Sequence, residues 1–267
     1  MTKGTRTRYS AKIAAHNLRL ARGLPKRASR WLSGYRRYYA DMRRYMRAVG
    51  SQGALGKFVL LPQIRDWTAT TGFDTHYVCQ GPWLFEKLLQ RKPPAHVDVG
   101  SYIGYLGFIS ALFPTTFIDI RPTGAKFEGF SEKKGSVLDL PYEDGEILSL
   151  SCLHVIEHIG LGRYGDPLDL DGSAKALAEL QRVLAPNGDL YLSVPSGRSV
   201  TYFNAHRVFD PAVIVEALDE LALVQLDAVL DGEKRVRPVT LEQLRDNAYA
   251  CGMYWFRRPS LDSGRVR

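Results

Sequence analysis

The stretch HVDVGSYIGYLG, residues 96–107, decides the fold. Its first four residues contain two valines and predict a short buried strand that ends at Gly100. The preceding residues 92–94, KPP, predict a loop, and a helical pattern begins near Ile103. The sequence therefore predicts a strand, a tight glycine turn and a helix in immediate succession.

A second apolar run, TFIDI at residues 116–120, predicts the next strand. It also ends in an acid, Asp119, which lies about 20 residues after Asp98, as in the Rossmann pattern. Strand, glycine turn, helix, strand and acid form the first half of a Rossmann-type nucleotide site. In such a site glycine lets the backbone approach the ligand, and the second acid accepts hydrogen bonds from the ribose hydroxyls.

The glycine spacing disfavours a dinucleotide. A dinucleotide site needs G-x-G-x-x-G, but Tyr102 stands two residues after Gly100. The pattern D-x-G-x-x-x-G instead resembles motif I of class I S-adenosylmethionine-dependent methyltransferases, with Tyr102 in place of the middle glycine of its commonest form. The resemblance implies S-adenosylmethionine as cofactor, with its ribose on Asp119. It implies that Asp98, Gly100 and Gly104 hold the methionine part of the cofactor and that Ser101 also contacts the cofactor.

Three later segments resemble the same family in the same order. Residues 135–142, GSVLDLPY, resemble the segment that meets the adenine, which implies cofactor contacts from Asp139 and Leu140. Residues 146–152 predict the fourth strand, and residues 179–195 resemble the helix, turn and fifth strand of small-molecule methyltransferases.

The expected fold class is therefore α/β, a Rossmann-like class I methyltransferase. Its seven-stranded, mostly parallel sheet would carry flanking helices. The resemblance implies that the last strands are residues 221–229 and 250–257, the final one inserted antiparallel.

The run CLHVIEHIGLGRYGDP, residues 152–167, follows the fourth strand. Ligands of open parallel sheets bind outside the carboxyl ends of the strands, so this run should border the site. His154, Glu157 and His158 have the spacing of one helical face and also spell the inverted zincin motif H-x-x-E-H. That motif needs a long helix and a further ligand, whereas this run follows a strand. We therefore expect no metal here.

Acid–base catalysis is the better interpretation of these residues. A hydroxyl acceptor must lose its proton as it attacks a methyl group, and a histidine suits that task. We predict His158 as the base, with Glu157 orienting or stabilising its imidazole, and His206 as a second candidate. His154 is expected to cap the turn or to bond the backbone.

Residues 157–167, EHIGLGRYGDP, resemble a methyltransferase-like family that is classed as a domain of unknown function. Further matches at residues 74–77 (DTHY), 119–122 (DIRP) and 203–207 (FNAHR) extend the resemblance over about residues 55–258. The family implies a setting in surface-polysaccharide biosynthesis. Four residues are expected to face the substrate: Arg163, Tyr164, Asn204 and Arg207.

Positive charge is concentrated at the N-terminus. Residues 1–50 hold 14 Lys and Arg against the single acid Asp41, although the whole chain has a net charge of only +8. We therefore expect a basic amphipathic N-terminal arm, residues 1–50, and a methyltransferase-like domain, residues 51–267.

A stripe of large side chains runs along the arm: Trp31, Tyr35, Tyr38, Met42 and Tyr45, at helical spacing. Five arginines surround it: Arg36, Arg37, Arg43, Arg44 and Arg47. Three interpretations remain open. The helix packs on the domain, or it binds an anionic membrane surface, or the arm is a targeting segment. No nucleic-acid partner is expected, because the fourth strand ends in SCLH and not in a motif of the Asp-Pro-Pro-Tyr type.

The predicted function is methyl transfer from S-adenosylmethionine to a small, sugar-like hydroxyl acceptor, a small molecule or a glycan. The alternative is a non-catalytic cofactor-binding or membrane-associated protein on the same fold, which the Tyr102 departure favours. Three cysteines far apart in sequence indicate a reducing compartment, and no apolar run reaches 18 residues. The expected location is cytoplasmic, with the arm allowing peripheral membrane contact.

Overall fold

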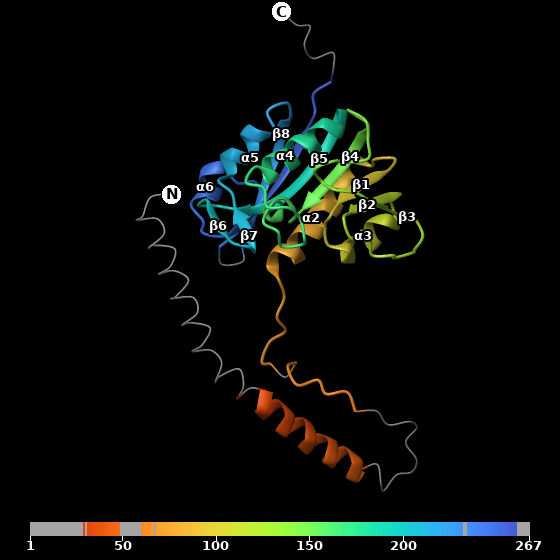
Figure 1. The fold of residues 1–267 in the computed structure, drawn as a ribbon, viewed down its shortest axis with the longest axis vertical. Coiled ribbons are helices and arrows are strands. Elements are labelled where there is room, and N and C mark those ends of the chain that lie inside the picture. The colour runs from red at the N-terminus through yellow and green to blue at the C-terminus, as the bar shows by residue number, and fades with distance from the viewer. Residues whose placement is uncertain (1–28, 30, 49–59, 67, 232–233, 261–267) are drawn as a thin grey trace, which may run out of the picture. The chain divides into compact units, whose positions relative to one another are not determined.

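The computed structural model describes residues 29, 31–48, 60–66, 68–231 and 234–260 (Figure 1). The chain divides into two compact units, residues 1–72 and residues 73–267. The predicted arm boundary after residue 50 and the first 28 residues lie outside the described part, so the extent of the arm stays a prediction.

The first unit contains a helix at residues 31–48 that contacts the segment at residues 60–66. Gly34 is buried, and a Cβ atom there would lie 3.0 Å from the Cβ of Ile64, so the missing side chain lets the two segments approach. The guanidinium of Arg65 lies 4.7 Å from the centre of the Trp31 ring. Within the described residues, no helix combines the length and apolar character needed to cross a membrane.

The second unit is built on a mostly parallel sheet (Figure 1). Its parallel strands are β1 (His96–Val99), β2 (Thr115–Asp119), β3 (Phe130–Lys134), β4 (Ile147–Leu153) and β5 (Leu184–Ser196). These strands lie in the order β3-β2-β1-β4-β5, so the direction of winding reverses between β1 and β4. That reversal is the topological switch point at which open α/β sheets bind ligands.

The C-terminal strands complete the sheet in antiparallel fashion. Strand β10 (Ala250–Arg257) lies between β5 and β8 (Ala222–Leu230) and is antiparallel to both, which confirms the expected insertion. The expected count of seven strands is wrong: β9 (Lys234–Val236) adds an eighth at the edge beside β8. The sequence offers no signal for β9, because three residues rich in Lys and Arg show no alternation.

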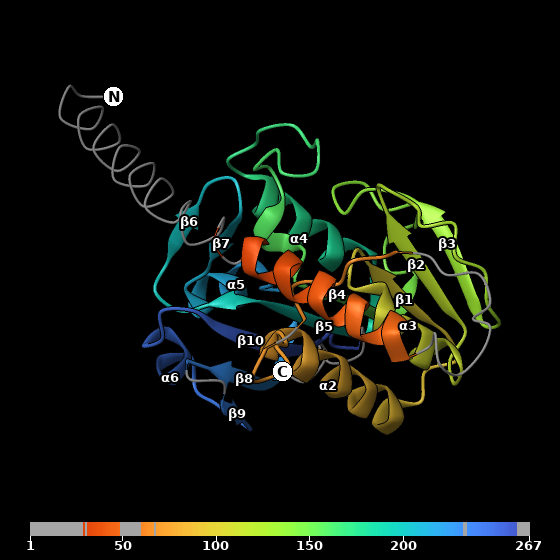
Figure 2. The ribbon, with the colours of Figure 1, turned by 90° about the horizontal axis from the view of Figure 1, so that it is seen from below.

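Helices cover both faces of the sheet (Figure 2). One core cluster contains side chains of α4 (Gly172–Val183), α5 (Pro211–Ala217) and α6 (Leu241–Arg245), packed against the strands. The other contains side chains of α2 (Thr75–Arg91) and α3 (Ile103–Ser110). The predicted α/β Rossmann-like architecture is confirmed, including the helix that was expected from Ile103.

Local sequence signals explain where α2 begins and ends. The side chain of Asp74 accepts hydrogen bonds from the backbone N–H groups of His76 and Tyr77, at 3.0 and 3.3 Å, and so caps the first turn. Lys92 adopts a left-handed conformation at the other end, and two prolines follow it. The cap fixes His76 and Tyr77 in the first turn of the helix, close to the end of β4.

A two-stranded ribbon follows β5. It consists of β6 (Val200–Tyr202) and β7 (His206–Val208), and the loop between them contains Asn204. The 3-10 turn η1 (Ile156–His158) follows β4 and contacts β7. These segments border the switch point on the side of the carboxyl end of β4.

Candidate functional site

A cavity lies at the switch point, where the carboxyl ends of β1, β2 and β4 meet. Its walls come from the glycine turn, the end of β2, the loop after β3 and the segment after β4. The lining residues are 100–102, 118–121, 135–138, 153–155 and 158–159, together with Tyr77, Val99, Tyr164 and Asp166. The two acid-bearing strand ends that the sequence singled out therefore meet at one cavity.

The glycine turn requires glycine at position 100. Gly100 has a φ of +68°, and a Cβ there would lie 3.2 Å from the side chain of Val155 and 3.8 Å from Oδ2 of Asp119. Its N–H donates to the carbonyl of Ile118 at 2.8 Å, which ties the turn to β2. A side chain at this position would occupy the space in which a ligand would meet the backbone.

Gly104 packs against Tyr102, and its predicted contact with the cofactor stays a prediction. It does not line the cavity, and a Cβ on it would collide with the ring of Tyr102. The ring of Tyr102 does line the cavity. The second glycine of the motif thus makes room for the tyrosine that replaces the family's middle glycine.

Asp98 lies beneath the turn and not at the cavity surface. Its Oδ1 accepts the N–H of Ser101 at 3.1 Å, and its Oδ2 accepts the hydroxyl of Ser151 in β4. The hydroxyl of Ser101 in turn accepts the N–H of Leu153 at 2.9 Å. Complete burial raises the pKa of Asp98 to about 6, against the opposite effect of these hydrogen bonds. Asp98 therefore holds the turn against β4, while Ser101 reaches the cavity.

Asp119 is placed where the prediction expected it, at the cavity. Its Oδ1 accepts the N–H of Arg121 at 2.7 Å. Among the described residues, its Oδ2 makes no hydrogen bond. One carboxylate oxygen therefore remains to accept a hydrogen bond from a ligand.

Asp139 and Leu140, predicted to meet the adenine, lie outside this cavity. They line a separate surface depression beside Glu179, whose Oε1 accepts the N–H of Leu140 at 2.7 Å. The cavity is lined instead by the three residues that precede Asp139, Ser136–Val137–Leu138. Cofactor contact from Asp139 and Leu140 stays a prediction that this geometry does not support.

The H-x-x-E-H run does not form one helical face, so that expectation is wrong. His154 has a φ of +56° and ends the strand, and the 3-10 turn begins only at Ile156. Glu157 is buried, and its Oε1 accepts a hydrogen bond from Nδ1 of His154 at 2.7 Å. The carboxylate is thus paired with His154, whereas the sequence paired it with His158.

His158 lines the cavity and is held by the backbone. Its Nδ1 lies 2.7 Å from the carbonyl oxygen of Ala205. A carbonyl can only accept, so Nδ1 carries the proton and Nε2 keeps its lone pair. Burial lowers the pKa of His158, so the imidazole is neutral at pH 7. Nε2 lies 3.7 Å from Oε1 of Glu157, which places a negative charge beside the atom that would take a proton.

Of the residues predicted to face the substrate, Tyr164 lines the cavity, whereas Asn204 and Arg207 do not. The guanidinium groups of Arg121 and Arg163 lie 4.3 and 5.1 Å from the centre of the Tyr164 ring. Asn204 is exposed in the β6–β7 loop. Nη1 of Arg207 donates to the carbonyl of Ile159 at 2.6 Å and to the hydroxyl of Ser173, so this arginine anchors the loop after β4 to α4.

Arg163 and His206 lie near the cavity without lining it. Nη1 of Arg163 donates to the carbonyl of Ala205 at 2.9 Å, the same oxygen that holds His158. The ring of His206 lies 5.2 Å from that of Tyr249, and burial lowers its pKa. Arg163 therefore shares a hydrogen-bond acceptor with His158.

Several cavity residues were not among the predicted site residues. Tyr77 is one, and burial raises its pKa to about 12, so its phenol is protonated at neutral pH and can donate a hydrogen bond. Arg121 and Leu138 are others. Tyr77 belongs to the DTHY segment, where the helix cap Asp74 was the available signal, whereas nothing in the local sequence directs Leu138 to the site.

The family model described as "Caenorhabditis protein of unknown function, DUF268" matches residues 147–226. Because that match covers less than half of the chain, the family of the whole chain stays a prediction. The sequence has no significant match among curated proteins.

Among solved structures, the chain is similar to the N-methyltransferase NodS from Bradyrhizobium japonicum WM9 in complex with S-adenosyl-L-homocysteine. The identity is 14%, the TM-score is 0.49, and the match covers 74% of this chain and 92% of that one. A second is the 1,6-didemethyltoxoflavin-N1-methyltransferase of Burkholderia thailandensis, at 17% identity and TM-score 0.48, covering 69% and 81%. A third is the [4+2]-cyclase SpnF, at 12% identity and TM-score 0.49, covering 67% and 82%.

The glycine turn generates a stability prediction with a control in the same segment. Gly100→Ala should destabilise the fold by about 1–2 kcal/mol, because a left-handed backbone is unfavourable for alanine. Gly107→Ala should be neutral or stabilise by up to about 1 kcal/mol, because Gly107 is helical and a Cβ there meets no atom within 4 Å. Urea unfolding of the two variants checks this, and equal effects would contradict the assigned role of Gly100.

Proposed function

We propose that the protein transfers a methyl group from S-adenosylmethionine to a small, sugar-like hydroxyl acceptor. The observation that carries the proposal is the position of His158. This imidazole, neutral and with Nε2 available, lines the same cavity as the glycine turn and Asp119. A base and a nucleotide-binding strand end thus face one space, as proton removal next to a bound cofactor requires.

The chain's residues fit the proposed cofactor. Gly100 leaves open the space that a Cβ would fill beside Asp119, and Asp119 has one carboxylate oxygen directed to that space. A carboxylate at the end of the second strand suits a ribose diol. When bound, S-adenosylmethionine supplies a methyl group on a sulfonium centre. Ser101 and Tyr102 would flank the methionine part of the cofactor.

The acceptor's hydroxyl proton would move to Nε2 of His158. The carbonyl of Ala205 fixes the ring through Nδ1–H, and Glu157, 3.7 Å from Nε2, stabilises the imidazolium that forms. The acceptor would enter past Tyr164, whose ring has two guanidinium groups beside it, and Tyr77, which also lines the cavity, would donate a hydrogen bond to the acceptor. Alignment of the hydroxyl with the methyl supplies most of the acceleration.

The acceptor class rests on the resemblance of residues 157–167 and not on a contact. We propose a glycan or nucleotide-sugar acceptor from surface-polysaccharide biosynthesis, with Arg163, Tyr164, Asn204 and Arg207 near it. The rival function is a cofactor-binding protein without catalysis. Tyr102 supports that rival, because its ring lines the cavity beside the turn where the family has glycine.

We also propose that the N-terminal arm holds the protein at an anionic membrane surface. In the helix at residues 31–48, the rings of Trp31 and Tyr35 lie next to each other, with centres 6.2 Å apart. The side chains of Trp31 and Tyr45 are 47% and 52% exposed, and arginines are distributed along the same helix. Aromatic rings with surrounding arginines suit the interface of an anionic bilayer. The proposed location is cytoplasmic, peripheral to the membrane.

Two of the three acids predicted for cofactor binding, Asp119 and Asp139, give a matched test. Asp119→Ala should weaken the affinity for S-adenosylhomocysteine by about 10-fold or more, because it removes a charged acceptor at the cavity. Asp139→Ala should leave the affinity within about twofold, because Asp139 lines a different depression. Isothermal titration calorimetry measures both. The site assignment fails if Asp119→Ala binds as well as the wild type, or if only Asp139→Ala binds poorly.

The base has a kinetic test. His158→Ala should lower turnover by about 100-fold or more and leave cofactor affinity unchanged, because His158 acts on the acceptor's proton. The acidic limb of the wild-type rate profile should lie below pH 6.5, because burial lowers the pKa of His158 and the neutral form is the active one. Transfer of labelled methyl from S-adenosylmethionine to a panel of monosaccharides and nucleotide-sugars measures both.

His206→Ala is the control for that test, since His206 does not line the cavity. Loss of turnover in His206→Ala but not in His158→Ala would show that the base is misassigned. Cofactor binding without product across the whole panel would favour the non-catalytic rival.

The arm predicts salt-sensitive membrane binding. The full chain should co-float with vesicles that contain anionic phospholipid, should not float with purely zwitterionic vesicles, and should be released at high salt. A variant with Arg36, Arg43, Arg44 and Arg47 replaced by Gln should lose flotation. Equal flotation with anionic and zwitterionic vesicles would contradict the proposal. Flotation of the variant with all four substitutions would contradict it too.

A further inference from the structure

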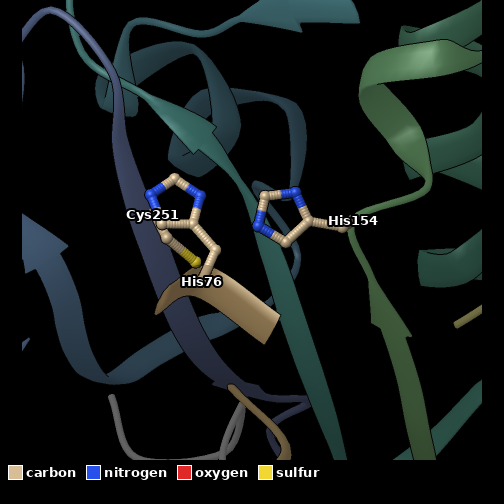
Figure 3. Close-up of side chains that lie close together, drawn as sticks. All are labelled: His76, His154 and Cys251. Atoms are coloured by element: carbon tan, nitrogen blue, oxygen red, sulfur yellow. The ribbon is translucent and has the colours of Figure 1, made fainter. Parts of the chain in front are cut away.

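We propose that His76, His154 and Cys251 form a binding site for a zinc ion. The three residues come from the first turn of α2, the end of β4 and the antiparallel strand β10. Each offers one ligand atom, and these atoms lie within 4.8 Å of one another (Figure 3). The inference does not depend on the proposed methyl transfer.

The donor set has the chemistry of a zinc site. Zinc binds cysteine sulfur and histidine nitrogen, and three protein ligands with an open fourth position are typical of reactive zinc sites. With metal–ligand distances of about 2.0–2.3 Å, tetrahedral donors lie about 3.5 Å apart. The three ligand atoms lie within 4.8 Å of one another, so the side chains need to close by no more than about 1 Å around the ion.

His154 has the hydrogen bonding of a metal-bound histidine. Its Nδ1 lies 2.7 Å from Oε1 of Glu157, and both side chains are more than nine-tenths buried. Its Nε2 is buried and makes no hydrogen bond to a nitrogen or oxygen atom of the described structure, and the thiol of Cys251 lies beside it. A carboxylate that orients the far nitrogen of an imidazole is the usual support of a zinc-bound histidine. Buried polar atoms nearly always have a partner, and a zinc ion bound to Nε2 would be such a partner.

The other two ligands are held firmly. The ring of His76 makes stacked contacts with the rings of His154 and Tyr249, whose centres lie 5.3 and 5.0 Å away. The backbone of His76 is fixed by the cap Asp74. Cys251 is a buried free thiol in a strand that is paired on both sides. The site therefore stands on regular elements and needs only small side-chain movements.

The site lies at the edge of the cavity described above. His154 belongs to both, and Tyr77, the neighbour of His76, lines the cavity. The sequence disfavoured a metal because the H-x-x-E-H run lacks its long helix. The proposed site uses only the first histidine of that run, and its other ligands are far away in sequence. The fold alone brings them together.

Cobalt substitution tests the site directly in the full-length chain. One equivalent of Co²⁺ should give the intense visible bands of a tetrahedral ion and a thiolate-to-cobalt charge-transfer band, and one equivalent of Zn²⁺ should remove both. Zinc affinity is measured by competition with a chromophoric chelator. The purified protein should retain one zinc per chain.

The variants separate the ligands from their neighbours. Cys251→Ser should lose the charge-transfer band, and Cys251→Ser and His76→Gln should each bind zinc at least about 100-fold more weakly. Glu157→Gln should keep the band but bind about 10–100-fold more weakly. Cys79→Ser is the matched control and should change neither, because Cys79 is a free thiol outside the ligand set.

Each result of these experiments either supports or overturns the proposed zinc site. Failure of the wild-type chain to bind either ion, a cobalt spectrum without a thiolate band, or loss of that band in Cys79→Ser would overturn the site. If Cys251→Ser does not fold, as judged by circular dichroism, His76→Gln gives the same test from the first turn of a helix. Retained zinc affinity in a folded His76→Gln variant would likewise overturn it.

Discussion

The buried carboxylate of Asp98 is the interaction on which the site depends. It accepts hydrogen bonds from the backbone of Ser101 in the glycine turn and from the hydroxyl of Ser151 in β4. Ser151 also contacts the fully buried ring of His96 at 2.9 Å. A buried charge is tolerated only when its acceptors are satisfied, so the turn and β4 are locked together at the switch point of the sheet.

That lock fixes the position of the groups that do the proposed chemistry. Because β4 is held against the turn, His158, which follows β4, lines the same cavity as Asp119, the last residue of β2. Strand β4 also delivers His154 and Glu157, which are paired with each other on the side of α2 and β10. Residues at the end of β4 thus contribute to two adjacent sites, the proposed methyl-transfer cavity and the proposed zinc site.

The features that follow from local sequence could be predicted. The strand, glycine turn and two strand-end acids follow from a few residues, and the inserted strand β10 followed from the resemblance. Features that depend on packing could not be predicted. Arg207 anchors a loop and the carbonyl of Ala205 holds the ring of His158, because neighbours distant in sequence decide each of these contacts. The proximity of Cys251 to His76 is of the same kind, since it exists only once β10 lies beside β5 and β8.

The most direct measurement is a crystal structure of the protein with S-adenosylhomocysteine. We predict the ribose hydroxyls on the carboxylate of Asp119, the backbone of Gly100 against the ligand, and the sulfur on the side of the cavity that His158 lines. A ligand bound elsewhere, or bound in this cavity with its sulfur directed away from His158, would contradict the account.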